Sequence, residues 1–432
     1  MSDPSGPARL TSPAGSPAPP ALGRGASKPW APVLDVVVFG LPLAVFCTTL
    51  ARGPSWGDST ELTLVAQTLS VAHPTGYPLY VLLAHIATLL PVGEIPFRVG
   101  LVSAVPVALA VWVIYRALVL LTESLPISAT AALALAFSQE LWSQASVPEV
   151  YGLHVLLTAA AIWATVRAIG APTFRRLALL AFILGLSFAH HGMTLFIGSA
   201  SIVAVLLSPG TRPLFNPGRI AALVGLFVLP LTLYGALWLI AHRPAPIDQG
   251  HLSTPMELAR HMTGRQFSYR MFSQPGGSWL GHEAKRLVRE AASQPCPWKI
   301  ACLPYLVLVV MGIRRLAGRP PVLALLGVSA LADVLYTVGY NIPDKSAYYL
   351  NLYVSLAMAG AVGLQDAIRL GAGHGRWSRL AWLLVLVPLV TNFGRSDRAG
   401  DTSMADYTKY IVALVPARSL VVTDDIILWW GF

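Results

Sequence analysis

Long apolar stretches separated by short polar loops are the dominant pattern of this chain. Many windows of about twenty residues hold no acidic side chain and almost no basic one, which suits an α-helix that crosses a bilayer. We count about eleven such segments, centred on residues 34–51, 98–115, 127–142, 150–167, 175–190, 192–208, 219–240, 299–313, 321–339, 348–367 and 379–393. The pattern therefore predicts an all-α polytopic membrane protein with about eleven transmembrane helices.

The composition agrees with this interpretation. Hydrophobic residues make up 55% of the chain, charged residues 12%, and the mean hydropathy is +0.62. These values exclude an ordinary soluble globular protein. The formal net charge is +10, but the bases are not gathered on a soluble domain, so nucleic acid is not an expected partner. Abundant Arg, Ala, Gly and Pro favour a GC-rich bacterial source and hence the bacterial plasma membrane.

The distribution of arginines predicts the orientation. Short loops on one side of the membrane carry bases and those on the other side nearly lack them, which places the N-terminus in the cytoplasm and the C-terminus outside. The basic loops hold Arg116, Arg167, Arg175, Arg176, Arg212, Arg219, Arg314, Arg315, Arg319, Arg369, Arg376 and Arg379. Segment 78–92 is apolar but short, so we expect it to be re-entrant or to lie on the outer surface.

The sequence predicts that the chain is organised in three parts. Residues 1–30 are rich in Pro, Ala, Gly and Ser and predict a disordered cytoplasmic tail. Residues 31–393 form the transmembrane domain, with large outer loops at 52–97 and 242–298; the second loop mixes basic and aromatic residues, which suits helices lying in the interface. Residues 394–432 form an outside segment, with a short helix at 404–415 and a β-branched run at 419–423.

Two carboxylates and a histidine directly follow the first span. Asp58 and Glu61 are three positions apart, on one face if the segment is helical. His73 comes next, in a turn built by two prolines and a glycine. Asp58 could serve as a helix N-cap with Glu61 as its capping-box partner. Alternatively, both acids do chemistry at the membrane surface, where a transferase acting on a lipid-linked sugar needs them.

Further polar residues occur at the outer ends of later spans. Glu149, Tyr151 and His154 begin one span, although Ser146 and Glu149 also have the spacing of a capping box. We expect His154 to point into the bundle, because ionisable groups rarely face lipid. His190 and His191 end another span. Adjacent helical positions point about 100° apart, so a packed pair is favoured over a metal site, with at least one ring lining the cavity.

Charged residues in the second half allow two interpretations each. Asp333 lies inside a span and either pairs with a polar neighbour or lines the cavity, which we favour. Arg265 and Arg270 suit a phosphate, which guanidinium binds bidentately, or anionic lipid head groups. Lys345 is expected to be a solvated loop charge. No spacing typical of a metal site occurs, and no cofactor is predicted.

Three segments together resemble one branch of the GT-C superfamily of polytopic glycosyltransferases. They are Trp56–Leu62, His73–Tyr80 and Phe97–Ala104. The branch is the family of the plexin-domain type of transmembrane protein O-mannosyltransferase, with its bacterial relatives. The resemblance extends over about 50–160 and includes Val147–Tyr151. The chain reads Asp-Ser-Thr-Glu where the family has Asp-Ser-Gly-Glu, and His-Pro-Thr-Gly-Tyr-Pro where it has His-Pro-Pro-Gly-Tyr-Pro.

The resemblance implies an inverting transfer of a sugar, mannose in the named family, from a polyprenyl-phosphate donor to a hydroxyl of a protein or glycan. Asp58 and Glu61 would be the catalytic residues, with Asp58 as the general base. Glu61, His73 and Glu149 would orient the acceptor or the sugar. Membrane lipids, the lipid-linked donor and the acceptor are the implied partners, and the active site would face outward. The substrate-binding residues would be His73, Tyr77, Glu149, Tyr151, His154, His190, His191, Arg265, Arg270, Asp333 and Tyr348.

Two other classes remain open from the sequence. In a proton-coupled transporter or lipid flippase, Asp333, the histidine pair and Glu149 would form a proton pathway. The sequence has no inverted repeat, however, and its polar groups lie at the outer face instead of the midplane. A non-catalytic assembly scaffold is the third class, and it would not require Asp58 and Glu61 to share a face.

Overall fold

The computed structural model describes residues 31–245, 249–250, 252–273, 279–295, 297, 303–342, 345–370, 381–416 and 419. These residues form helices, together with one isolated bridge between Met271 and Tyr340. In the first half the helices are α1 (Ala31–Thr49), α2 (Asp58–Thr68), α3 (Pro78–Thr88), α4 (Ile95–Thr122), α5 (Leu125–Ala136), α6 (Gln139–Ala145), α7 (Tyr151–Gly170), α8 (Phe174–Phe188) and α9 (Thr194–Leu207).

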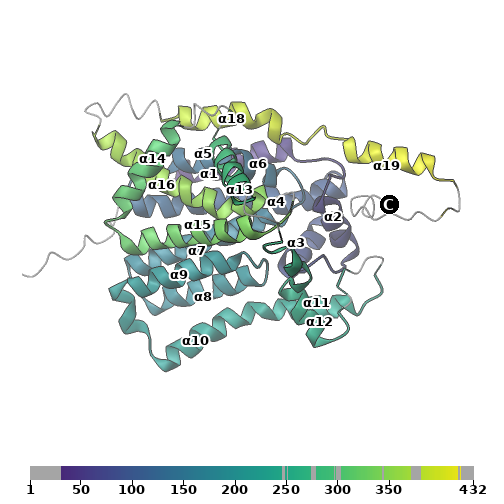
Figure 1. Ribbon diagram of the computed structural model, residues 1–432, viewed down its shortest axis with the longest axis horizontal. Helices are drawn as coiled ribbons and strands as arrows, with labels where there is room; N and C mark the ends of the chain where they lie inside the picture. Colours follow the sequence, from purple (N-terminus) through teal and green to yellow (C-terminus); the bar gives the residue numbers. More distant parts are fainter. Residues whose placement is uncertain are drawn as a thin grey trace, which may run out of the picture.

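The second half continues the bundle and adds helices outside it. These are η1 (Pro209–Leu214), α10 (Pro217–Val228), η2 (Leu229–Thr232), α11 (Leu233–Ala241), α12 (Pro255–Met262), η3 (Arg265–Arg270), α13 (Trp279–Ser293), α14 (Leu303–Leu316), α15 (Pro320–Gly339), η5 (Ser346–Tyr349), α16 (Leu350–Leu370), α18 (Leu383–Ser396) and α19 (Ser403–Leu414). In Figure 1 the long helices run roughly side by side, and α2, α11, α12 and α19 gather at one end, called the site end below.

Six segments among the described residues are long and apolar enough to cross a membrane: Ala31–Thr49, Ile95–Thr122, Tyr151–Gly170, Pro217–Ala241, Pro320–Gly339 and Ser346–Leu370. Shorter apolar helices, such as α5, α9 and α18, lie among them. The protein is therefore an integral, multi-pass, all-α membrane protein. The count of about eleven spans remains a prediction.

Some expected spans are broken. The segment at 127–142 divides into α5 and α6 around Ser138, whose hydroxyl donates to Leu135 O (2.7 Å). The segment at 219–240 divides into α10, η2 and α11 around Pro230, which cannot donate a helical hydrogen bond. The 78–92 segment is the eleven-residue helix α3. At 1.5 Å per residue it is about 16 Å long, too short to span a bilayer.

Glycines bring two helix pairs into close contact. A Cβ added to Gly312 on α14 would overlap the carbonyl oxygen of Ala359 on α16, and one added to Gly363 would overlap that of Leu308. At the start of α7, a Cβ on Gly152 would lie 2.7 Å from Ser103 O of α4. Small residues of this kind let helix backbones approach closely in membranes. The contact at Gly152 holds the beginning of α7, and with it Glu149, against α4.

The outside segments correspond in part to expectation. Helix α19 confirms the short helix predicted at 404–415. Helices α12 and α13 lie in the expected loop 242–298. Lys345 corrects a prediction, because its side chain is 1% exposed and its Nζ lies 3.1 Å from Glu283 Oε1 of α13. Residues 1–30 and 420–423 lie outside the described residues, so the expectations for them are not addressed.

Candidate active site

Asp58 is the first residue of α2, at the site end. The N-cap is Gly57, with φ +74° and ψ −149°, a conformation that glycine adopts readily. No side chain caps the helix there, so the predicted N-cap role of Asp58 is wrong. The reason is that the chain enters the helix one residue earlier than expected. The side chain of Asp58 is 57% exposed and remains available for other partners.

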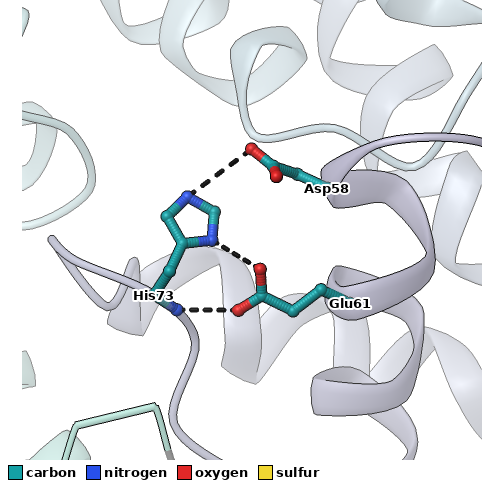
Figure 2. A group of neighbouring side chains, drawn as sticks. All are labelled: Asp58, Glu61 and His73. Atoms are coloured by element: carbon teal, nitrogen blue, oxygen red, sulfur yellow. Dashed lines mark hydrogen bonds and ion pairs between the residues drawn. The ribbon is translucent and has the colours of Figure 1, made fainter. Parts of the chain in front are cut away.

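Glu61 and His73 form a hydrogen-bonded pair next to Asp58 (Figure 2). Glu61 is one turn further along α2 and only 1% exposed. Its Oε1 accepts the backbone N–H of His73 at 2.8 Å, and its Oε2 lies 2.7 Å from His73 Nδ1. Both carboxylate oxygens are thus directed at one residue. Glu61 therefore fixes the turn that carries the imidazole.

His73 links the two acids. Its Nε2 lies 3.7 Å from Asp58 Oδ2 and 3.0 Å from the hydroxyl of Tyr77, which in turn donates to Pro74 O at 3.2 Å. Burial lowers the pKa of His73, but the charge and hydrogen bond of Glu61, helped by Asp58 and Glu149, outweigh it and raise the pKa to about 9. At neutral pH the ring is therefore an imidazolium between two carboxylates.

The same three side chains could hold a metal ion. One ligand atom each from Asp58, Glu61 and His73 lies within 4.8 Å of the others. A metal needs a neutral imidazole, whereas a pKa near 9 keeps this ring protonated at neutral pH. A metal ion would therefore have to displace the proton of this ring. The sequence named no metal ligand, and that expectation stays a prediction.

Glu149 reaches the same area from the start of α7. Ser59 Oγ donates to its Oε1 at 3.3 Å, and its backbone N–H donates to Ser103 Oγ at 2.8 Å. The predicted capping box of Ser146 and Glu149 is wrong: α7 begins at Tyr151, and Ser146 Oγ donates to Trp142 O instead. Glu149 is thus free of helix capping and adds a third carboxylate beside α2.

Rings of the predicted histidines and tyrosines meet next to this carboxylate group. Tyr77 stacks on His191 with centroids 5.5 Å apart, and His191 also contacts Tyr151 (5.7 Å) and His154 (5.3 Å). Tyr348 packs against Tyr151 at 5.8 Å. We call Tyr77, Tyr151, His191 and Tyr348 the aromatic wall. It brings together residues from the N-cap of α3, from α7, from the α8–α9 turn and from η5.

His190 has a different role from its neighbour. Its side chain is fully buried, and Nε2 donates to Val150 O at 2.9 Å. His191 instead accepts the backbone N–H of Met193 at Nδ1 (3.1 Å). The two rings lie 6.2 Å apart with 60° between their planes. The pair is packed as expected, and His191 is the member that belongs to the aromatic wall.

The two predicted phosphate ligands lie in different surroundings. Arg265 lines a polar cleft of about 460 Å³ together with Arg260 and His261. Arg270 instead is pinned to the end of α15, because its carbonyl accepts the N–H of Asn341 at 3.0 Å. Its guanidinium stacks over Tyr269, 5.4 Å from the ring centroid. The structure therefore separates these arginines.

Tyr340, which is not among the predicted site residues, lies within electrostatic reach of both Arg270 and Asp58. Burial and Tyr336 raise the pKa of Tyr340 to about 12; Arg270 lowers it, and Asp58 raises it. Both charges are thus within electrostatic reach of one hydroxyl. Tyr340 also packs against Tyr348, with centroids 5.6 Å apart. The run of tyrosines from 340 to 349 was the sequence signal that could have identified it.

Asp333 lies inside α15. It is fully buried, with Oδ1 accepting from Asn351 Nδ2 at 3.3 Å and Oδ2 from the N–H of Leu352 at 3.0 Å. Asn351 in turn accepts from Thr158 at 3.2 Å. These bonds make Asp333 a polar link between α15 and α16, and its place in the cavity wall stays a prediction. Its buried carboxyl group is tolerated there because both oxygens are hydrogen-bonded.

Comparison with known proteins identifies the part of the chain that carries this site. Residues 58–212 match the model of the protein O-mannosyl-transferase TMEM260 N-terminal domain. The mouse (Mus musculus) protein O-mannosyl-transferase TMEM260 is 37% identical over 188 residues, which are 41% of this chain and 26% of the mouse protein. The resemblance to the TMEM260 family is confirmed. This chain spans only about a quarter of that relative's length.

Solved structures share the fold. ArnT from Cupriavidus metallidurans, bound to undecaprenyl phosphate, matches with a TM-score of 0.62 and 12% identity, over 94% of this chain and 85% of that chain. The oligosaccharyltransferase of Archaeoglobus fulgidus, in complex with Zn and sulfate, matches with a TM-score of 0.56 and 13% identity, over 88% and 55%. This chain thus shares its helical arrangement with both structures.

Proposed function

We propose that this protein is a membrane glycosyltransferase. It moves a sugar, mannose by its resemblance to TMEM260, from a polyprenyl-phosphate donor to a hydroxyl of a protein Ser or Thr or of a glycan. The observation that carries the proposal is the Asp58–His73–Glu61 group, which lies within the residues matched by the O-mannosyltransferase model. The undecaprenyl phosphate of the ArnT structure supports a lipid-linked donor.

The exposure of the two acids decides their roles. Asp58 is 57% exposed at the site end, whereas Glu61 is 1% exposed and has both oxygens on His73. A general base must come within hydrogen-bond distance of the proton it takes. Asp58 is therefore the base, and Glu61 is a positioning residue that holds His73 beside it.

The chemical step is an inverting displacement. Asp58 takes the proton of the acceptor hydroxyl, and the oxygen forms a bond to the anomeric carbon. The bond between that carbon and the phosphate oxygen breaks, and the polyprenyl phosphate leaves with the electron pair. Arg270 lies within electrostatic reach of the same hydroxyl as Asp58, so we assign it, in preference to Arg265, to the leaving phosphate. The aromatic wall offers ring faces to the sugar.

The site end faces outward in this proposal. The arginines of the short loops favour this orientation, and a donor with its tail in the bilayer then presents its sugar to Asp58. The plasma membrane of a bacterium is the proposed location on composition. The transporter alternative is not favoured, because Asp333, its main intramembrane acid, has both oxygens bonded to Asn351 and Leu352.

Replacing Asp58 with Asn tests the proposal directly. Asn keeps the shape of the side chain but cannot accept a proton, so sugar transfer should fall on the order of 10²–10⁴-fold. Transfer of labelled mannose from polyprenyl-phosphate mannose is measured in proteoliposomes with the full chain. Asp366→Asn is the control, because Asp366 makes only a partly exposed ion pair with Arg315 at 3.8 Å. Near-normal transfer by a folded Asp58→Asn variant ends the proposal.

A further inference from the structure

Helix α19 lies beside the linker that leads into α2, at the site end (Figure 1). Two hydrogen bonds attach the tail segment to the two ends of this linker. The N–H of Arg398 donates to Thr49 O at 2.8 Å, and the indole Nε1–H of Trp56 donates to Ser403 Oγ at 2.8 Å. Residues more than 340 positions apart in sequence thus fix the approach to Asp58.

The hydrogen bond from Trp56 is the first of two consecutive hydrogen bonds, from Trp56 to Ser403 and from Ser403 to Asp401. Ser403 Oγ donates its own proton to Asp401 Oδ1 at 2.6 Å, which leaves its lone pairs for the indole. The N–H of Ser403 donates to the same oxygen at 3.0 Å. These bonds, and Arg398, hold the pKa of Asp401 below its usual range. The ring of Trp56 also packs on Tyr407 of α19, with centroids 5.3 Å apart.

The side chain of Asp58 has few contacts of its own to fix its position. Gly57 precedes it with φ +74°, and no heavy atom lies within 4 Å of the Cβ position there. The start of α2 has no side-chain cap, and the contact of Asp58 with His73 is long, at 3.7 Å. Glycine has more backbone freedom than any other residue type. The side chain of Trp56, one residue before this glycine, is therefore the nearest fixed point on the N-terminal side of Asp58.

We propose that Trp56 is a positioning residue for Asp58 and that α19 holds it through the Trp56–Ser403–Asp401 chain. The inference rests on the proposed function, since it assumes that Asp58 is the base. Misplacement of a catalytic group lowers turnover more than substrate binding. Loss of the indole bond should therefore lower kcat about five- to tenfold and leave the KM values of donor and acceptor within about twofold.

Four variants of the full chain and one control test the proposal. Trp56→Phe keeps a ring on Tyr407 but removes the donor, and Ser403→Ala removes the acceptor. Because both remove the same bond, the double variant should lose no more kcat than either single variant. Ser403→Thr retains a hydroxyl and should restore kcat. Lys409→Ala is the control, since Lys409 lies on the same helix with its side chain 80% exposed.

A second measurement separates this inference from the proposed function. Backbone hydrogen exchange over residues 54–62 should be faster in Ser403→Ala than in Lys409→Ala. If the wild-type chain transfers no sugar, the proposed function fails while the exchange result still decides whether α19 orders the Asp58 loop. Unchanged kcat in folded Trp56→Phe and Ser403→Ala, multiplicative losses in the double variant, or equal exchange in Ser403→Ala and the control would each overturn the proposal.

Discussion

Replacing Glu61 with Gln should change how thermal stability depends on pH. Glu61 is buried, and both of its oxygens accept hydrogen bonds from His73. Gln has nearly the same shape but no charge, and it offers one acceptor oxygen instead of two. The variant therefore removes the principal charge that stabilises the imidazolium while it keeps most of the packing.

The magnitude follows from the pKa of His73. Burial alone lowers this pKa, whereas Glu61 and the nearby acids raise it from 6.5 to about 9. A difference of about 2.5 pKa units corresponds to roughly 3 kcal/mol. Because the folded-state pKa is the higher one, this stabilisation is fully present below pH 6.5 and is lost as the pH rises through about 9. In Glu61→Gln most of this contribution is absent at every pH.

The assay is the thermal unfolding midpoint in detergent, measured from pH 6 to pH 9.5. The unfolding midpoint of the wild type should exceed that of Glu61→Gln most at pH 6. The difference between the two midpoints should become smaller as the pH approaches 9.5. Glu257→Gln is the matched control: the pKa of Glu257 is lowered by its bonds with Ser253 and Thr254, so its charge does not change over this range. A gap between wild type and Glu61→Gln that is constant with pH would refute the reasoning.

Three further outcomes are expected. Chelation with EDTA should leave sugar transfer within about twofold, because a metal at this site would have to displace the proton of His73, which Glu61 and Asp58 stabilise; loss of transfer that Mn²⁺ restores would contradict this. Asp333→Asn should lower the free energy of unfolding by about 1–3 kcal/mol, since one buried N–H loses its acceptor, without changing kcat of the folded protein; a normal unfolding midpoint would show the link to be unimportant. Arg270→Ala should raise the donor KM about tenfold and Arg265→Ala much less; equal effects would contradict the separation of the two arginines.

Much of the fold could be predicted because the bilayer imposes a simple rule. Apolar segments of sufficient length must be helical in lipid, so the six membrane-crossing segments of the structure fall on expected spans. The breaks at Ser138 and Pro230 were not predicted. These helix breaks depend on the hydrogen bonding of single residues. A hydropathy value averaged over a window does not detect the effect of one residue.

The sequence could predict which residues belong to the candidate site, but not the contacts among them. The three-residue spacing of Asp58 and Glu61 indicated a shared helix face, and the structure places both beside His73. Their unequal exposure depends on how α2 packs, which the spacing does not contain. Lys345 was misjudged for a similar reason: its partner, Glu283, comes from another element of the chain.

Hydrogen bonds from two different helices hold the turn that carries His73. Glu61 holds it from within, and His261 of α12 binds the carbonyl of the preceding residue, Ala72, at 3.1 Å. The segments 52–97 and 242–298 are therefore joined through the hydrogen bonds of one peptide unit. A displacement of α12 would act on that peptide unit, and so on the residue whose imidazole lies beside Asp58.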